Sequence, residues 1–263
     1  MNCFIFDLDG VITNPVEKKV TQPELFTFFK RILDNGDVLT INTGRQIPWI
    51  EQRVIKPFEK TLSPEETHHI FISAEKGAVW QEQGKDFIVD TSCSIPKEIQ
   101  EQTEKLVVDE FSDCMFYDSG KQTMMSIEML DGTDIALYHQ RREDFVRAVK
   151  KILENAGITN LSIDKTNIST DIENKGVGKD LGIQRILTWL DEKNNDISHF
   201  YCFGDSPSDI AMGDKLYAEN KPFTYIFTGQ PERLSEVNID FPLTQTQALF
   251  DKGTVEYLHS LLA

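Results

Sequence analysis

The order of strands and helices along the sequence is the feature that most restricts how this chain can fold. Short apolar strands alternate with amphipathic helices in the first and last thirds of the chain. The strands expected in the first third are Asn2–Phe6, Val38–Ile41, His69–Ser73 and Ala78–Gln81, the last two around the turn Glu75-Lys76-Gly77, with helices at Gln22–Asp34 and Ile47–Ile55. The last third gives strands at Phe200–Phe203 and Phe223–Phe227 and helices at Lys179–Leu190 and Thr254–Leu262. Because strands joined through helices run parallel, we expect an α/β fold with a doubly wound, mostly parallel sheet.

The middle of the chain has a different pattern, in which each helix is followed by two strands. The expected helices are Lys97–Phe111 and Arg142–Asn155, and the expected strands are Cys114–Tyr117, Thr123–Met129, Asn160–Asp164 and Asn167–Ile172. A helix–hairpin–helix–hairpin order is typical of an α+β unit with an open sheet. We therefore expect residues 84–174 to form a second domain, inserted into a core made of residues 1–83 and 175–263.

The strands of the insert alternate between apolar and polar residues. Met125, Ile127 and Met129 share one face, Ile168 and Ile172 share another, and the opposite positions are Ser126, Glu128, Ser169 and Asp171. Successive side chains of a strand point to opposite faces, so one face should pack on the helices and the other should be polar. The polar face is either simply solvated or a polar lid over a cleft.

The charge of the chain excludes some classes of partner. Its net charge is −16, which disfavours general binding to nucleic acid or to an anionic membrane. No apolar run approaches the roughly 20 residues of a membrane span, and the first residues do not resemble a signal peptide. The four cysteines contain no CxxC pair and are expected to be reduced, buried thiols. These features predict a cytoplasmic protein that binds neither nucleic acid nor membrane.

Acidic residues follow two of the apolar strands of the core. Asp7 and Asp9 come directly after Asn2–Phe6, and because residues i and i+2 share a face, both carboxylates can point into one site. Asp205 follows Phe200–Phe203, and Asp209 lies four residues further on. Each pair has a plain structural alternative: an acidic turn for the first, and for Asp209 a capping box at the start of a helix. That alternative does not explain Asp205.

Two weaker signals suggest an anion site beside these carboxylates. Thr43 and Gly44 follow the strand Val38–Ile41, and a threonine hydroxyl with a glycine amide can cradle an anion. Lys179 lies at the expected start of a helix, where a cation is unfavourable to the helix dipole unless an anion is bound nearby. Taken alone, the first is more often an ordinary turn and the second a solvated lysine, and Lys175 competes with Lys179 for the same role.

The motifs are more informative together than separately. Neighbouring parallel strands deliver their C-terminal residues to one edge of a sheet, so the acidic, Thr-Gly and lysine motifs should meet there. Crowded carboxylates need a cation, and oxygen ligands without histidine or cysteine favour Mg²⁺.

In order and in strand context, the four motifs resemble those of the haloacid-dehalogenase-like phosphohydrolase superfamily. The insert resembles the large cap of the sugar-phosphatase branch, which includes Cof-type phosphatases, trehalose-6-phosphate phosphatase, sucrose-phosphatase and phosphomannomutase. The segment Phe71–Trp80 also resembles the approach to that cap. The resemblance implies a Mg²⁺-dependent phosphatase with a small phosphorylated sugar or polyol as its substrate.

The resemblance also implies roles for individual residues. Asp7 would be the nucleophile that forms an aspartyl-phosphate, and Asp9 would be the general acid and base. The Mg²⁺ ligands would be Asp7, the Asp9 carbonyl, Asp205 and, directly or through a neighbour, Asp209. Phosphate oxygens would be bound by Thr43, the Gly44 amide and Lys179.

Substrate selection would depend on the insert and on the rim of the core site. The candidates are Arg45, Lys121, Ser126, Glu128, Ser169 and Asp171. Two other functions stay open: a phosphosugar mutase or phosphotransferase on the same scaffold, and a non-catalytic binding protein with this fold.

Overall fold

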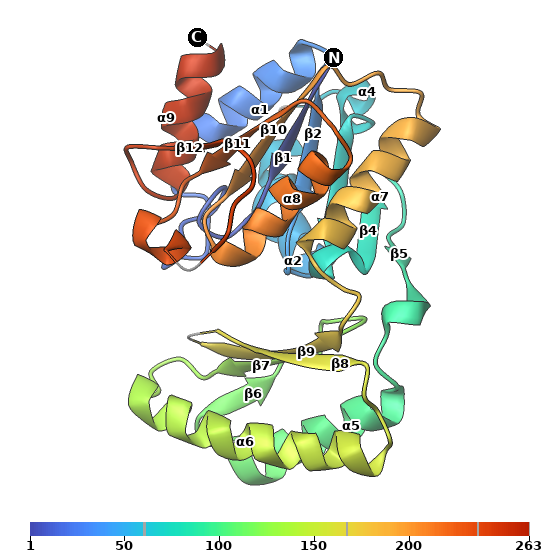
Figure 1. Cartoon of the computed structure of the whole chain (residues 1–263), viewed down its shortest axis with the longest axis vertical. Coiled ribbons are helices and arrows are strands. Elements are labelled where there is room, and N and C mark those ends of the chain that lie inside the picture. Colours follow the sequence, from blue (N-terminus) through green and yellow to red (C-terminus); the bar gives the residue numbers. More distant parts are fainter. Residues whose placement is uncertain (60–61, 167, 236, 263) are drawn as a thin grey trace. The chain divides into compact units, whose positions relative to one another are not determined.

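The computed structural model describes residues 1–59, 62–166, 168–235 and 237–262 (Figure 1). The chain divides into two compact units, one formed by Met1–Ile88 with Gly178–Ala263 and the other by Val89–Val177. No helix among the described residues is both long enough and apolar enough to cross a membrane. Cys3, Cys114 and Cys202 are buried free thiols, as predicted, and Cys93 is a partly exposed one.

The first unit is built on an eight-stranded sheet. In spatial order the strands are β12 (Leu243–Gln245), β11 (Phe223–Phe227), β10 (His199–Gly204), β1 (Asn2–Phe6), β2 (Val38–Asn42), β3 (Ile70–Ala74), β4 (Val79–Glu82) and β5 (Ile88–Val89). The strands from β12 to β3 are all parallel, whereas β4 runs antiparallel to β3. The mostly parallel sheet predicted from the sequence is therefore confirmed.

Helices cover both faces of this sheet, so it is doubly wound (Figure 1). They are α1 (Glu24–Asp34), α2 (Ile47–Ile50), α3 (Lys56–Glu59), α4 (Pro64–Thr67), α7 (Lys179–Glu192), α8 (Ile210–Ala218) and α9 (Asp251–Leu262). A π-helical turn, Glu51–Ile55, joins α2 to α3 where one continuous helix was expected. The rings of Phe6 and Phe203 contact α1 and α9 through Phe29 and Tyr257. Side chains at alternate positions of the same strands, such as Ile5 and Cys202, face α7 and α8.

The first helix illustrates how the sequence pattern determines burial. The buried residues of α1 are the five apolar side chains predicted to share one face: Leu25, Phe28, Phe29, Ile32 and Leu33. Burying a side chain of this size contributes about 1.5–3 kcal/mol. The helix ends just before Gly36, whose φ of +74° suits glycine.

The second unit is an α+β unit, and its four-stranded sheet is antiparallel, with the order β6-β7-β9-β8. Its elements are α5 (Lys97–Leu106), a π-helical turn (Val107–Phe111), β6 (Met115–Tyr117), β7 (Met125–Met129), α6 (Ile135–Asn155), β8 (Leu161–Lys165) and β9 (Ser169–Asn174). Both helices pack on the same face of this sheet (Figure 1). Asn167, the first residue of one expected strand, lies outside the described residues.

The expected start of the second helix of this unit was wrong. Helix α6 begins at Ile135, seven residues before the predicted Arg142. Asp134 caps the helix by accepting a hydrogen bond from the Leu137 amide at 2.9 Å. Ile135 and Leu137 are exposed, and only Tyr138 is buried among residues 135–142, so the first turns do not show the repeated apolar spacing of a helical face.

Candidate active site

Three neighbouring parallel strands end at the same edge of the large sheet. Strand β1 lies between β10 and β2, so the residues that follow these strands come out side by side. They are Asp7 after β1, Thr43 after β2 and Asp205 after β10. The Asp7 amide still donates a hydrogen bond to the Phe203 carbonyl at 3.0 Å, which fixes the aspartate at the end of the strand ladder.

Three aspartates form a buried acidic group at this edge. One carboxylate oxygen from each of Asp7, Asp205 and Asp209 lies within 4.8 Å of the other two. Their residues are 7%, 7% and 1% exposed, respectively. Gly10 permits this crowding: its φ is +79°, and a Cβ atom there would lie 2.5 Å from the Asp205 carboxyl carbon.

Asp209 has a different environment for each of its oxygens. Oδ2 accepts hydrogen bonds from the Asp205 amide at 3.1 Å, the Ser206 amide at 3.0 Å and the Ser206 hydroxyl at 2.7 Å, which confirms the predicted capping box. Oδ1 is buried and accepts no well-aligned hydrogen bond from the described residues, although it lies 2.8 Å from Lys179 Nζ. The capping interpretation therefore accounts for one oxygen and leaves the other facing the site.

Lys179 is the cation at the centre of the site. It is the first residue of α7 and is 6% exposed. Its ammonium donates to Asp7 Oδ1 and, at 2.8 Å, to the Asn42 carbonyl. Burial by itself lowers the pKa of this lysine, but Asp209 and Asp7 outweigh burial and raise the pKa above its usual value. Lys179 is therefore charged at neutral pH.

One lysine does not neutralise three carboxylates. Burial and the neighbouring charge of Asp209 raise the pKa of Asp7 well above its usual value. The same two causes raise the pKa of Asp205 to about 7. Buried carboxylate oxygens that repel each other are the chemistry that suits a hard divalent cation such as Mg²⁺. Asp7, Asp205 and Asp209 thus fit a metal site.

The loop after β2 brings Arg45 against Asp9. The Thr43 hydroxyl accepts a hydrogen bond from the Arg45 amide at 3.2 Å, which tightens the loop. The Arg45 guanidinium donates twice to the Asp9 carboxylate, with Nε at 2.7 Å and Nη2 at 3.3 Å, and its Cζ lies 4.9 Å from the Trp49 ring centroid. Arg45 was expected only as a substrate-binding residue at the rim of the site. The structure shows that it also forms a two-point ion pair with Asp9.

Some residues near the site were missed by the sequence analysis. The Asn42 side-chain amide donates to the Lys179 carbonyl at 2.8 Å, and Arg233 Nη1 lies 3.4 Å from Asp205 Oδ2. The side chain of Lys76 lies beside Gly44. Asn42 directly precedes Thr43 and could have been included. Lys76 lies in a turn that the sequence marked without assigning it a role, and Arg233 lies in a segment that no motif marked.

The candidates in the second unit lie on one face of its own sheet. Ser126 is paired with Asp171 across β7 and β9, and Glu128 is paired with Ser169. The Ser126 hydroxyl donates to Asp171 Oδ1 at 2.6 Å. Lys121 is in the connection between β6 and β7. The two strands therefore form a continuous polar face, but its role in binding stays a prediction.

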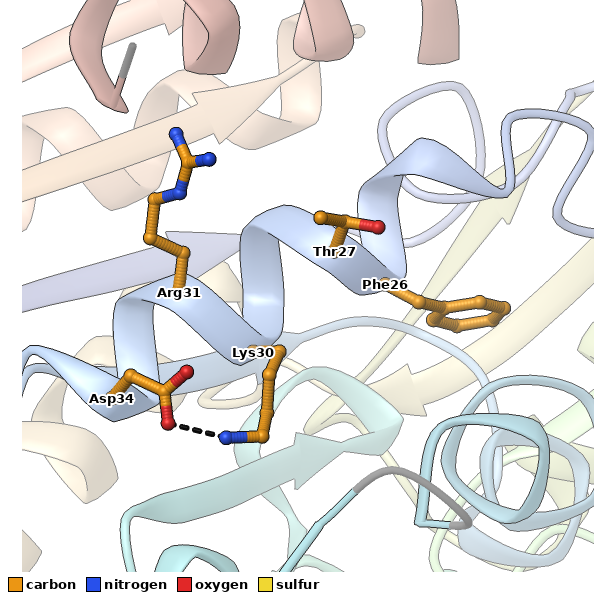
Figure 2. A pocket seen from close by; sticks show the side chains of 5 residues that line it. All are labelled: Phe26, Thr27, Lys30, Arg31 and Asp34. Carbon is orange, nitrogen blue, oxygen red and sulfur yellow. Dashed lines mark hydrogen bonds and ion pairs between the residues drawn. The ribbon is translucent and has the colours of Figure 1, made fainter.

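A hollow elsewhere in the first unit is separate from the residues at the strand ends of the large sheet. It has a volume of about 320 Å³, and its lining among the described residues comes from α1: Phe26, Thr27, Lys30, Arg31 and Asp34 (Figure 2). An ion pair between Lys30 and Asp34 crosses one side of it (Figure 2). The hollow gathers no cluster of catalytic groups, so the strand ends are the better candidate for the active site.

Solved structures of known proteins share this architecture. Solved structures similar to the chain include the C-terminal domain of trehalose-6-phosphate phosphatase from C. albicans (TM-score 0.73, 14% identity, 99% of this chain and 92% of that chain covered). A haloacid dehalogenase-like hydrolase from Bacteroides thetaiotaomicron gives a TM-score of 0.65 at 14% identity, with 99% of both chains covered. The sucrose-phosphatase of Synechocystis sp. gives 0.59 at 15% identity, with 98% of this chain and 97% of that chain covered.

These likenesses establish the fold, and the sequence itself establishes the family. No curated protein matches the sequence of this chain. The family model for haloacid dehalogenase-like hydrolases matches residues 4–167, which include the end of β1, the loop after β2 and most of the second unit. With its acidic edge on a doubly wound sheet, the chain belongs to the haloacid dehalogenase-like hydrolase family.

Proposed function

We propose that this protein is a Mg²⁺-dependent phosphatase that hydrolyses a small phosphorylated sugar or polyol through an aspartyl-phosphate on Asp7. The observation that carries the proposal is the buried contact between the Asp7 carboxylate and the Lys179 ammonium at the end of β1. The structural neighbours named as sugar-phosphate phosphatases support the choice of substrate class. The buried free thiols support work in a reducing compartment, which we take to be the cytoplasm.

Asp7, Asp205, Asp209 and the main-chain carbonyl of Asp9 would hold the Mg²⁺ ion. When bound, the ion would supply positive charge that offsets the repulsion between the carboxylates and a phosphate dianion. Lys179, the Thr43 hydroxyl and the Gly44 amide would bind the phosphate oxygens. Catalysis of phosphoryl transfer depends mainly on positioning the reactants and neutralising their charge. These groups could do both, because they lie together at the strand ends.

The reaction would then proceed in two steps. A carboxylate oxygen of Asp7 attacks phosphorus, the ester P–O bond breaks, and Asp9 gives its proton to the leaving sugar oxygen. In the second step Asp9 takes a proton from a water molecule, which attacks phosphorus and releases inorganic phosphate and free Asp7. The two donors of Arg45 orient the Asp9 carboxylate for both steps. Arg45 thus acts on the reaction through Asp9, in addition to any contact with substrate.

The second unit would select the substrate through its polar sheet face. A sugar offers hydroxyl groups, and the carboxylates of Glu128 and Asp171 can each accept two hydrogen bonds. Ser126 and Ser169 can donate or accept, and Lys121 adds a cation from the connection before β7. Phe116 is directly opposite Glu128 and 41% exposed, which adds an apolar surface to the same face.

The test is phosphate release from a panel of sugar and polyol phosphates, with Mg²⁺ or with EDTA. Asp7→Asn should reduce turnover by at least about a thousandfold and leave the circular dichroism spectrum unchanged. Asp191→Asn, an exposed aspartate at the end of α7, is the matched control and should retain full activity. Full activity of Asp7→Asn, or turnover in EDTA, would contradict the mechanism.

The same panel separates the alternative functions. Turnover of p-nitrophenyl phosphate without turnover of any sugar phosphate would contradict the proposed substrate class. It would still support the proposed phosphatase activity. A requirement for a sugar bisphosphate activator, with phosphate transferred to a second sugar position, would identify a mutase. Absence of both reactions in a folded, Mg²⁺-binding protein would identify a non-catalytic relative.

A further inference from the structure

The turn between β3 and β4 has an unusual backbone. Glu75, Lys76 and Gly77 have φ angles of +45°, +55° and +94°. This left-handed region costs an L-residue other than glycine about 1–2 kcal/mol, and asparagine tolerates it best. At two other left-handed positions the chain does use asparagine, Asn194 and Asn220. A lysine at position 76 is therefore not explained by the backbone alone.

The turn lies between the two elements that carry the phosphate-binding groups. On one side, the Lys76 amide donates to the Thr43 carbonyl at 2.9 Å, and the Glu75 amide donates to the Arg45 carbonyl at 3.1 Å. On the other side, Gly77 packs so closely on α7 that a Cβ atom there would lie 2.5 Å from the Gly182 amide nitrogen. The conformation of the turn is thus fixed by the loop after β2 and by the helix that begins with Lys179.

The side chain of Lys76 runs along Gly44. Its Cγ and Cε atoms both lie 3.8 Å from the point that a Cβ atom of Gly44 would occupy. The ammonium is one bond beyond Cε, and the residue is partly exposed. The Lys76 ammonium therefore lies within reach of an anion bound at the Gly44 amide.

We propose that Lys76 is a further substrate-binding residue, whose ammonium pairs with the substrate phosphate at the Gly44 amide. This inference rests on the proposed function. A phosphate dianion is repelled by a chain of net charge −16 and by the four aspartates of the site. Each nearby cation should therefore strengthen phosphate binding. The stem of Lys76 lies against the loop that carries the Gly44 amide.

The test separates the charge of Lys76 from its effect on the backbone. Lys76→Asn and Lys76→Gly both remove the charge, and both residues tolerate a left-handed φ. Lys76→Arg keeps the charge. Lys18→Asn is the matched control, because Lys18 has a φ of +49° and loses the same charge on another loop. The measurements are kcat and KM for the best ester, the inhibition constant of inorganic phosphate, and the urea midpoint.

We expect Lys76→Asn and Lys76→Gly to raise KM and the phosphate inhibition constant about tenfold, in line with one charge-assisted contact, while kcat changes less than about threefold. Lys76→Arg should restore most of the binding, Lys18→Asn should leave both constants unchanged, and no Lys76 variant should lower the urea midpoint. Unchanged constants in Lys76→Asn, or a joint loss of kcat and stability, would overturn the inference.

Failure of the proposed function gives a different result. If the wild type hydrolyses no ester, the proposed function fails, and the inference is judged on inorganic phosphate binding measured by calorimetry. Weaker binding of phosphate to Lys76→Asn than to the wild type and Lys18→Asn would still support it. Equal binding, or no binding to the wild type, would overturn it.

Discussion

Replacing Asp205 by asparagine should make the metal-free protein more stable while damaging the site. Burial and the charge of Asp209 raise the pKa of Asp205 from 3.8 to about 7, against the opposing charges of Arg233 and Lys179. Each pKa unit corresponds to about 1.4 kcal/mol, so ionised Asp205 costs the folded protein about 4 kcal/mol above pH 7. Asparagine removes the ionisation and keeps an oxygen for Arg233. We expect a net gain of at least about 1 kcal/mol in EDTA at pH 8.

The sign of the pH effect follows from the raised pKa of Asp205. A carboxyl group whose pKa is higher in the folded state stabilises the fold fully below its unfolded pKa, and this contribution disappears as the pH rises through the folded value. In EDTA the wild type should therefore lose stability between about pH 4 and pH 7 relative to Asp205→Asn. Urea unfolding at several pH values measures this difference.

Mg²⁺ should stabilise the wild type more than it stabilises Asp205→Asn. A ligand at 100 times its dissociation constant stabilises the folded state by about 2.7 kcal/mol, and Asp205→Asn should lose most of this gain. Asp191→Asn, on the exposed end of α7, should stay within about 0.5 kcal/mol of the wild type in both buffers. A variant less stable than the wild type in EDTA, or an equal gain from Mg²⁺ in both proteins, would refute the argument from charge repulsion.

Three further changes test packing and charge at other positions of the two units. Gly77→Ala should lower the free energy of unfolding by about 2–5 kcal/mol in urea, because φ is +94° and the new Cβ would clash with α7; a loss under 1 kcal/mol would contradict the close approach. Burial raises the pKa of Glu82, but hydrogen bonds from Lys193, Lys85 and Trp189 outweigh burial and lower it. The wild type should therefore lose more stability than Glu82→Gln as the pH falls from 5 to 3, and parallel profiles would contradict this. Phe145→Ala should cost the second unit about 3–5 kcal/mol by calorimetry, since Phe145 is fully buried there; an unchanged transition would exclude it from that core.

Much of the fold could be predicted because burial follows a period in the sequence. The five buried side chains of α1 have the spacing of one helical face, and the apolar strands of the large sheet stand out as short runs. The start of α6 could not be predicted in this way, because it depends on the Asp134 cap and on exposed residues. The π-helical turn Val107–Phe111 was also missed, since its backbone shift leaves the apolar pattern of the helix in place.

The location of the site could be predicted for a similar reason. Residues that follow neighbouring parallel strands meet at one edge, so Asp7, Thr43 and Asp205 needed only the strand order to be brought together. The pairing of Arg45 with Asp9 could not be foreseen, because it joins residues 36 positions apart through side-chain geometry. Lys76 reaches Gly44 from a turn whose left-handed backbone no periodicity reveals.

The charges at the acidic edge conflict with one another in ways that a bound metal and a bound anion would relieve. Lys179 stands at the N-terminus of α7, where the helix dipole opposes a cation, and it is held there by Asp7 and Asp209. Those carboxylates are in turn buried beside Asp205, which raises the pKa of Asp7 and Asp205. Every one of these conflicts weakens when a divalent cation joins the carboxylates and an anion joins Lys179. A metal and a phosphate together would balance the charges of the proposed site, and the Asp205→Asn comparison measures the cost of one of these charges.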